Sequence, residues 1–384
     1  MKWPTVSCRR AAAALFLAAC GTGGGAGSDT TFADSAGVTI ATGPTEDRLL
    51  DWTLTELFRL GGAEEGPGSF TSAYPITVGT DAQGRIYVLD SPEFRVEVFD
   101  RDGRHLRFLG RKGGGPGELD FPNVLTVEPA GIVGVQDIAK RAFVRWGPDG
   151  EVLPVLRIEG FLQYGATLRG DTMVYIHQTY AERSRGSRLR ITTPSDTVDL
   201  PGIENATGGM VMFTCMGFNS PPLFARDVAY SVADSRIAMT HQVPYQVDLY
   251  DGFGWVRSVR RAIPPETPTA QHVGRLYPDG LQMTGGAGTC TTPASELYEK
   301  LGVSSQLPLI RAVALDPRGR LWVERYTFKD EPARVDVFDR EGHYLGSLTG
   351  KNLPLGFVGE NVVLFPEEDP DTGVIQVVAY RISE

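Results

Sequence analysis

The feature that most constrains this chain is an internal repeat. Residues 60–70 (LGGAEEGPGSF) and 109–119 (LGRKGGGPGEL) align without a gap, and RVEVFDRDGRHLRFLG (95–110) nearly recurs as RVDVFDREGHYLGSLTG (334–350). The unit is about 45–50 residues long and contains short runs rich in Val, Ile, Tyr and Phe, separated by Gly, Asp and Pro. Such a pattern predicts a series of similar small β-sheets, not a single large one.

The number of units follows from the second strand of each sheet. We place these strands near residues 85–89, 131–136, 172–177, 235–241, 319–324 and 361–365. The last unit has only three strand-like runs before the chain ends, and residues 53–62 (TLTELFRLGG) supply the fourth. A short four-stranded sheet cannot bury both of its faces alone, whereas radial stacking of several sheets can. The prediction is an all-β fold of six four-stranded antiparallel blades, with the last blade closed by an N-terminal strand.

The repeat also resembles a known family. A G-x-G-P-G-E connector, an IYVxD strand and an RVxVFD strand, found here at 113–118, 86–90 and 95–100, are similar to the six-bladed β-propellers of the NHL-repeat type. The resemblance covers nearly all of residues 52–384. It implies a propeller with loops presented at the two ends of a central channel.

The glycine-rich stretch at 109–123 invites a phosphate-binding interpretation, which we reject. A P-loop needs Gly-Lys-Ser/Thr at the start of a helix, whereas Glu118, Asp120 and a strand follow these glycines. We interpret the stretch as a connector whose glycines allow turns with positive φ.

The N-terminus predicts export. Lys2, Arg9 and Arg10 precede the apolar run AAAALFLAA, which is shorter than the about 20 residues that span a bilayer. The sequence Leu17-Ala18-Ala19-Cys20 resembles a bacterial lipobox, which implies a lipoprotein signal peptide over residues 1–20 and acylation of Cys20. The alternative is ordinary cleavage, with Cys20 incidental. Residues 21–37 are rich in Gly, Ser and Thr and predict a flexible tether, and the propeller domain would cover 38–384.

The lipobox resemblance also implies a location and a partner. The residue after the cysteine is Gly21 and not the Asp typical of inner-membrane retention, which favours the outer membrane of a bacterial cell envelope. The lipid bilayer would be one partner, reached through Cys20. The formal net charge is −10, or −13 once the three basic residues of the signal are removed (−10 − 3). An acidic chain without basic runs excludes a nucleic-acid partner, and we expect a monomer.

Two segments depart from the repeat. Residues 203–223 and 263–308 lengthen the links between blades 3 and 4 and between blades 4 and 5, so both should rise from the same face. Thr267-Pro268 and Thr292-Pro293 predict the starts of short helices in the second insertion. Each insertion holds one cysteine, Cys215 or Cys290, in an oxidising compartment. A disulfide between them is the favoured interpretation, with two free thiols or a metal or reactive role as alternatives.

The residues after each second strand should ring the channel mouth on the insertion side. They are Asp90, Asp137, His177, Gln178, His241, Gln242, Glu324 and Arg325. Two carboxylates with His177 and His241 are ligand types for zinc or calcium. The alternative, which we favour, is that the aspartates cap turns, that the histidines are ordinary polar loop residues, and that no cofactor is bound.

No H-E-x-x-H, C-x-x-C, G-x-S-x-G or P-loop pattern accompanies this ring. We therefore interpret the chain as a membrane-anchored binding protein for a small molecule, glycan, peptide or protein, and not as an enzyme. A metal-dependent lyase or hydrolase at the channel mouth, similar to the lactonases, is the alternative. A structural scaffold of the envelope is a third.

Overall fold

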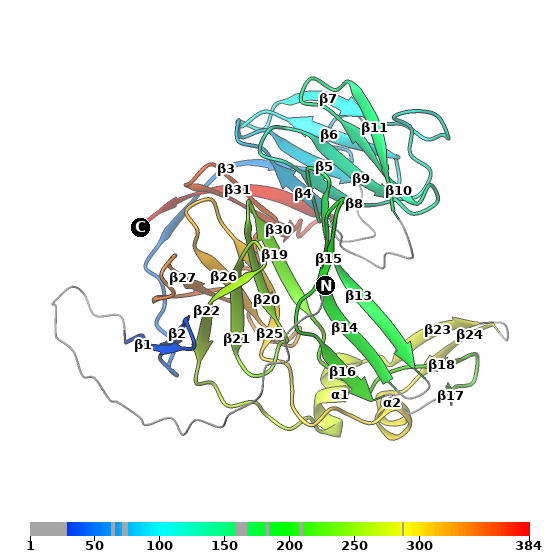
Figure 1. Cartoon of the computed structure of the whole chain (residues 1–384). Helices are drawn as coiled ribbons and strands as arrows, with labels where there is room; N and C mark the ends of the chain where they lie inside the picture. Colours follow the sequence, from blue (N-terminus) through cyan, green and yellow to red (C-terminus); the bar gives the residue numbers. More distant parts are fainter. Residues whose placement is uncertain are drawn as a thin grey trace, which may run out of the picture.

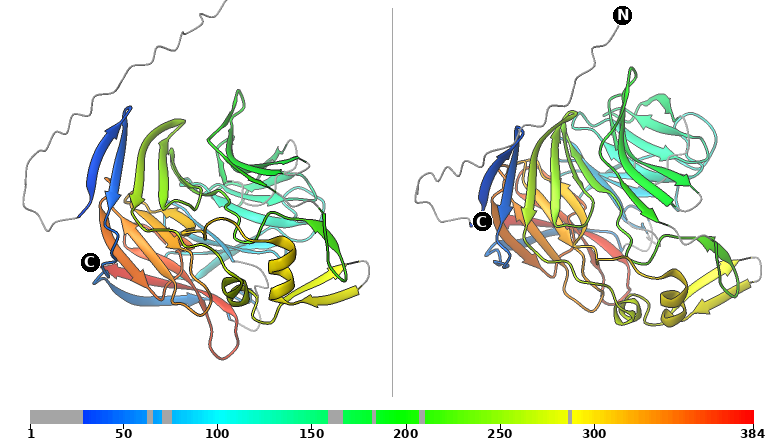
Figure 2. Two further views of the ribbon diagram at one scale, coloured as in Figure 1. Left: turned by 90° about the horizontal axis from the view of Figure 1, so that it is seen from below. Right: turned by 60° about the horizontal axis from the view of Figure 1, so that its bottom comes forward.

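The computed structural model describes residues 29–62, 66–70, 76–158, 167–181, 184–206, 210–285 and 288–384. Within these ranges six antiparallel sheets follow one another in chain order, which confirms the predicted six-bladed β-propeller (Figures 1 and 2). The predicted signal peptide and Cys20 lie outside the described residues.

The strands of the first three blades are β4 (Thr77–Thr80), β5 (Ile86–Asp90), β6 (Arg95–Phe99) and β7 (His105–Leu109); β8 (Pro122–Val127), β9 (Val133–Asp137), β10 (Ala142–Trp146) and β11 (Val152–Arg157); and β12 (Thr167–Arg169), β13 (Thr172–Ala181), β14 (Ser184–Thr192) and β15 (Thr197–Asp199), with β16 (Ile203–Ala206) also paired to β14. The strands of blades 4 to 6 are β19 (Ala229–Ala233), β20 (Arg236–Thr240), β21 (Gln246–Asp251) and β22 (Gly254–Arg261); β25 (Ile310–Leu315), β26 (Leu321–Arg325), β27 (Arg334–Phe338) and β28 (Tyr344–Thr349); and β29 (Gly356–Val358), β30 (Val362–Glu368), β31 (Ile375–Ser383) and β3 (Thr53–Leu60).

Blade 6 is closed by the N-terminal strand, as predicted. β3 pairs antiparallel with β31, with Thr53 opposite Ser383 and Leu60 opposite Val377. Figure 1 shows the blue β3 alongside the red β31. The two ends of the propeller domain therefore share one sheet, which covers the edge that β31 would otherwise expose.

Apolar side chains fill the space between neighbouring blades. Six buried clusters lie at the six blade-to-blade interfaces of the described chain, and one side chain from each is Val135, Leu168, Ile237, Phe338, Val378 and Ile86. Each blade therefore buries both of its faces against its neighbours, which explains why the second strands β5 and β9 are buried along their whole length.

The glycine-rich stretch is a connector, as expected. The Glu118 carboxylate accepts a hydrogen bond from the Gly115 amide at 2.7 Å, and Lys140 Nζ donates to the Gly115 and Glu118 carbonyls at 3.2 and 2.6 Å. Gly117 has φ +70°, in the left-handed region that glycine adopts at little cost. These hydrogen bonds are all made within the protein itself, and the connector leads directly into β8.

The prediction of a flexible tether over residues 21–37 is wrong for the second half of that segment. Residues 31–35 form β1 (Thr31–Ser35), which pairs with β2 (Val38–Gly43), and β2 pairs in parallel with β22 of blade 4. The turn between them uses positive φ at Ala36 and Gly37. The polar composition of this segment gave no sign of a hairpin. β2 buries Val38 and Ala41 against the edge of an existing sheet, so the hairpin needs no apolar core of its own.

The two insertions fold together into one unit, which we call the cap (residues 210–224 and 263–308, as far as described). It contains the hairpins β17 (Met210–Met212) with β18 (Gly217–Asn219) and β23 (Leu281–Gly285) with β24 (Gly288–Thr292), and the helices α1 (Ala270–Leu276) and α2 (Ala294–Leu301). The two short helices were predicted, but their N-caps are Thr269 and Pro293 and not Thr267 and Thr292, so neither proline occupies the first helical position. The hairpins were not predicted, because two-stranded hairpins rely on the packing around them for stability.

Candidate functional site

The cap lies on the face of the propeller that also carries the loops after each second strand. In antiparallel blades, the links between blades and the loops from the second to the third strand share one face, which we call the insertion face. The cap has its own buried cluster, including Val273, Leu297 and Phe213, which extends onto Phe328 in the blade 5 loop. In Figures 1 and 2 the yellow cap elements gather at one end of the molecule.

A disulfide joins the two halves of the cap. Cys215 from the first insertion is bonded to Cys290 from the second, with 5.8 Å between their Cα atoms. Leu223 also exchanges backbone hydrogen bonds with Gly302 and Ser304 at 3.0 and 2.9 Å. The favoured pairing is therefore present, and the two insertions are covalently connected.

We expect that replacing both cysteines, Cys215→Ser with Cys290→Ser, lowers the free energy of unfolding by about 2–4 kcal/mol. The bridge closes a segment with a sequence separation of 75 residues, so its loss restores much freedom to the unfolded chain. Urea unfolding would measure the change, and the reduced wild-type chain is the matched control. Unchanged stability in both would contradict a structural role for the bridge.

The residues of the predicted ring make separate local contacts. Asp137 caps a turn, accepting hydrogen bonds from the amides of Asp120, Phe121 and Lys140 at 2.7, 3.2 and 3.0 Å. Asp90 occupies the equivalent buried position of blade 1, where burial raises its pKa although Arg95 at 3.3 Å opposes that effect.

The His-Gln pairs differ from each other. β13 continues to Ala181, so His177 and Gln178 lie within the strand and not at its end, and His177 stands opposite Arg188. The ring of His241 contacts the Pro201 carbonyl at 3.0 Å. Gln242 links blades, because its side-chain oxygen accepts from the Asp227 amide at 2.8 Å and its carbonyl from the Leu309 amide at 2.9 Å.

Nothing in the described part of the chain gathers metal ligands. No three His, Cys, Asp or Glu side chains there lie close enough together to hold an ion. Burial lowers the pKa of His177, and the charge of Arg190 lowers it further. A cation at His177 would meet the same repulsion from that arginine.

Glu324 and Arg325, from the end of β26, have separate roles. Glu324 is nearly buried, and burial raises its pKa, with the nearby Arg311 only partly offsetting the effect. The side chain of Arg325 instead forms an ion pair within a separate group of charged residues, which is described below.

We expect Glu324→Gln to stabilise the protein at neutral pH. Because the folded-state pKa of Glu324 lies above its ordinary value of 4.5, the ionised carboxylate costs stability that is absent below pH 4.5 and grows as pH rises through the folded-state pKa. The melting temperature of the variant should exceed that of wild type at pH 7 and match it at pH 4. The exposed Glu341→Gln is the control, and a lower melting temperature for Glu324→Gln at pH 7 would contradict the expectation.

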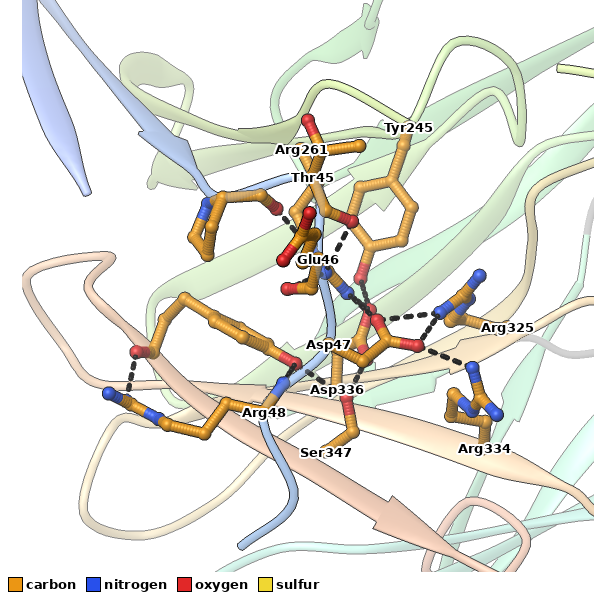
Figure 3. Close-up of polar contacts among 12 residues, drawn as sticks. Thr45, Glu46, Asp47, Arg48, Tyr245, Arg261, Arg325, Arg334, Asp336 and Ser347 are labelled. Carbon is orange, nitrogen blue, oxygen red and sulfur yellow. Dashed lines mark hydrogen bonds and ion pairs between the residues drawn. The ribbon is translucent and has the colours of Figure 1, made fainter. Parts of the chain in front are cut away.

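The main polar site was missed by sequence reasoning. Residues 44–52, which we call the strap, cross from β2 on blade 4 to β3 on blade 6 and pass over blade 5 (Figure 3). The Asp47 carboxylate of the strap meets Arg261 and Arg325, each at 2.9 Å, and also Arg334. We call these three arginines the arginine cluster.

Arg261 holds the centre of this site. Its side chain is fully buried and pairs with the equally buried Asp336 at 2.9 Å. Asp336 also accepts hydrogen bonds from the Tyr245 and Ser347 hydroxyls, both at 2.6 Å. Burial and the neighbouring Asp336 raise the pKa of Tyr245 well above its usual value, so the phenol stays a donor.

Arg261 also fixes the backbone of the strap. It donates to the carbonyls of Pro44, Thr45 and Glu46 at 2.9, 3.1 and 2.8 Å. A cavity of about 460 Å³ lies beside the strap, lined by Asp29, residues 44–48 and Tyr344. Asp47 therefore lies between this cavity and the arginine cluster.

One sequence signal for this site existed. Asp336 is the acid in the middle of RVDVF, a third strand whose other side chains are apolar, and the matching Glu97 of RVEVF is equally buried. Glu97 accepts from the Gly68 amide at 2.7 Å and from Arg95 at 3.0 Å. A buried acid in this position requires a buried partner, but the sequence did not show which one.

Comparison with solved structures places the chain among six-bladed β-propellers. A Bacteroides fragilis protein described as exported superposes with a TM-score of 0.54 and 13% identity, over 90% of this chain and 100% of that one. A member of the DUF4221 family from Bacteroides vulgatus superposes with a TM-score of 0.50 and 9% identity, over 86% and 98%. At these identities the likeness shows the fold. No family model and no curated protein matches the sequence.

Proposed function

We propose that this chain is an exported propeller of the NHL-repeat type, anchored in the bacterial envelope through acylated Cys20, that binds a small molecule, glycan or peptide at its insertion face. The supporting observation is the asymmetry of the two faces. The insertion face carries the cap and the arginine cluster, and Asp47, which pairs with those arginines, also lines the 460 Å³ cavity, which is of the size that ligand sites have.

The opposite face offers shorter loops. Its hairpin turns are closed by backbone hydrogen bonds, such as Asp100 N–H to the Arg104 carbonyl at 2.8 Å and Asp339 N–H to the His343 carbonyl at 3.0 Å. Loops that carry binding residues are generally longer and are presented by a rigid scaffold. This contrast favours the insertion face.

Binding should be tested with the full chain in detergent against a panel of muropeptides, oligosaccharides and short peptides, followed by thermal shift. We expect a probe that stabilises the wild type to lose its effect in at least one insertion-face variant, either Gln178→Ala with His241→Ala or Arg325→Gln with Arg334→Gln. It should keep its effect in Arg101→Ala, in an exposed turn of the opposite face. A panel without any stabilising probe, or with probes indifferent to both insertion-face variants, would contradict the proposal.

The anchor is tested separately. We expect the wild type to incorporate labelled palmitate and to sediment with the outer membrane, because stable anchoring needs at least two acyl chains or equivalent signals. Cys20→Ala should abolish both the label and the sedimentation. No helix among the described residues is long and apolar enough to cross a bilayer. A wild-type chain that carries no label would overturn the lipid anchor.

A further inference from the structure

The contacts of Asp47 raise the question of why a surface carboxylate should meet three arginines. The Asp47 side chain is one quarter exposed. Within the described chain it is the one carboxylate within ion-pair distance of Arg325 and Arg334. Arg261 has its own buried partner in Asp336. The guanidinium groups of Arg325 and Arg334 therefore share the carboxylate of Asp47.

Between Pro44 and Leu49 the strap is held by polar contacts. Residues 45–49 are exposed when main chain and side chain are taken together, and Leu49 is 68% exposed. Arg261 holds the backbone at residues 44–46, and Arg48 donates to the carbonyls of Tyr344 and Leu345 at 3.0 and 2.7 Å. The Asp47 side chain can therefore rotate away from the arginines without uncovering apolar surface or moving the strap backbone.

We propose that the arginine cluster is a binding site for a small-molecule carboxylate, that Asp47 is its internal occupant, and that a ligand entering from the cavity displaces Asp47. Planar guanidinium groups are strong hydrogen-bond donors to carboxylates, and one nitrogen of Arg325, Nη1, already donates to both oxygens of Asp47 at 2.9 Å. The inference rests on the proposed function and specifies the ligand chemistry at the same face.

The rest of the cavity restricts the ligand further. Glu46 and Asp29 also line it, and their charges repel a second anionic group. The ligand should therefore carry one carboxylate and an uncharged or cationic remainder. A cavity of about 460 Å³ accommodates a molecule of amino-acid or dipeptide size.

The test measures binding of 6-aminohexanoate to the full chain by calorimetry. Asp47→Asn keeps the shape of the side chain but removes the competing charge, so its affinity should exceed that of the wild type by about tenfold, or about 1.4 kcal/mol. Adding Arg325→Gln and Arg334→Gln to Asp47→Asn should abolish the gain. Hexylamine, which lacks the carboxylate, should not bind, and succinate and inorganic phosphate should bind more weakly than 6-aminohexanoate.

A matched control is available at an ion pair between the cap and the blade 5 loop. Asp330 accepts two hydrogen bonds from Arg275, at 2.7 and 3.0 Å, and Glu331 also pairs with Arg275, so Asp330→Asn removes one of two carboxylates from an arginine elsewhere and should not gain affinity. Arg325→Gln with Asp47 intact is a second variant, expected to weaken binding while barely changing the melting temperature. An equal gain in Asp330→Asn, retained binding after loss of both arginines, or tighter binding of phosphate would overturn the inference. A probe that binds the insertion face independently of Asp47 and the arginines would overturn it while leaving the proposed function intact.

Discussion

A chain that begins at Gly62, and so lacks β3 together with β1, β2 and the strap, is expected not to fold, chiefly because of β3. Its loss leaves β31 with an open edge and removes Leu60 and Phe58 from the interface with blade 1 and Leu54 from the interface with blade 5. Each such side chain contributes about 1.5–3 kcal/mol when fully buried. Their sum with the lost strand pairing approaches the whole stability of a domain, about 5–15 kcal/mol.

A rescue experiment separates ring closure from simple truncation. Because Thr53 lies opposite Ser383 in the sheet, residues 52–61 can be joined after Glu384 through a short turn and still pair with β31. This permuted chain should recover a native circular dichroism spectrum and a single gel-filtration peak, whereas the truncated chain should aggregate. A stable, monomeric truncated chain would mean that blade 6 does not need the strand.

The second large effect concerns Arg261. We expect Arg261→Met to lower the free energy of unfolding by about 3–5 kcal/mol, because it leaves the Asp336 charge buried without its cation and releases three strap carbonyls. Urea unfolding of the full chain would measure the loss.

Two companions test the electrostatic cause. Arg260→Met changes the neighbouring residue of β22, for which no carboxylate lies within ion-pair distance in the described chain, and should cost much less. Arg261→Met combined with Asp336→Leu removes both buried charges and should recover part of the loss. If Arg260→Met were as damaging as Arg261→Met, lost packing and not the unpaired charge would explain the effect.

The repeat allowed much of the fold to be predicted because each blade is specified locally. Alternating apolar residues and turn glycines recur in every unit, so strand positions, blade number and closure by residues 53–60 follow from comparing the chain with itself. The pairing of Cys215 with Cys290 follows from the same frame, since it places both insertions on one face.

The local surroundings of the candidate ring residues could not be predicted in this way. Its residues were aligned by strand ends, but β13 runs on to Ala181 and keeps His177 inside the sheet. Gln242 adopts a positive φ of 68° and turns its side chain to bond the Asp227 amide. Small differences in strand length and backbone conformation decide where a polar side chain points, and the repeat does not encode them.

By itself, the amino-acid order determined the architecture: six similar sheets, one of them completed across the chain ends, with two long excursions on one face. The folded arrangement alone decided the polar site, because Asp47 and Arg261 are far apart in sequence and meet only after the strap has crossed blade 5. Strand patterns act between near neighbours and repeat, so they can be recognised in one dimension. Ion pairs depend on distance and burial in three dimensions, and leave no periodic trace in the sequence.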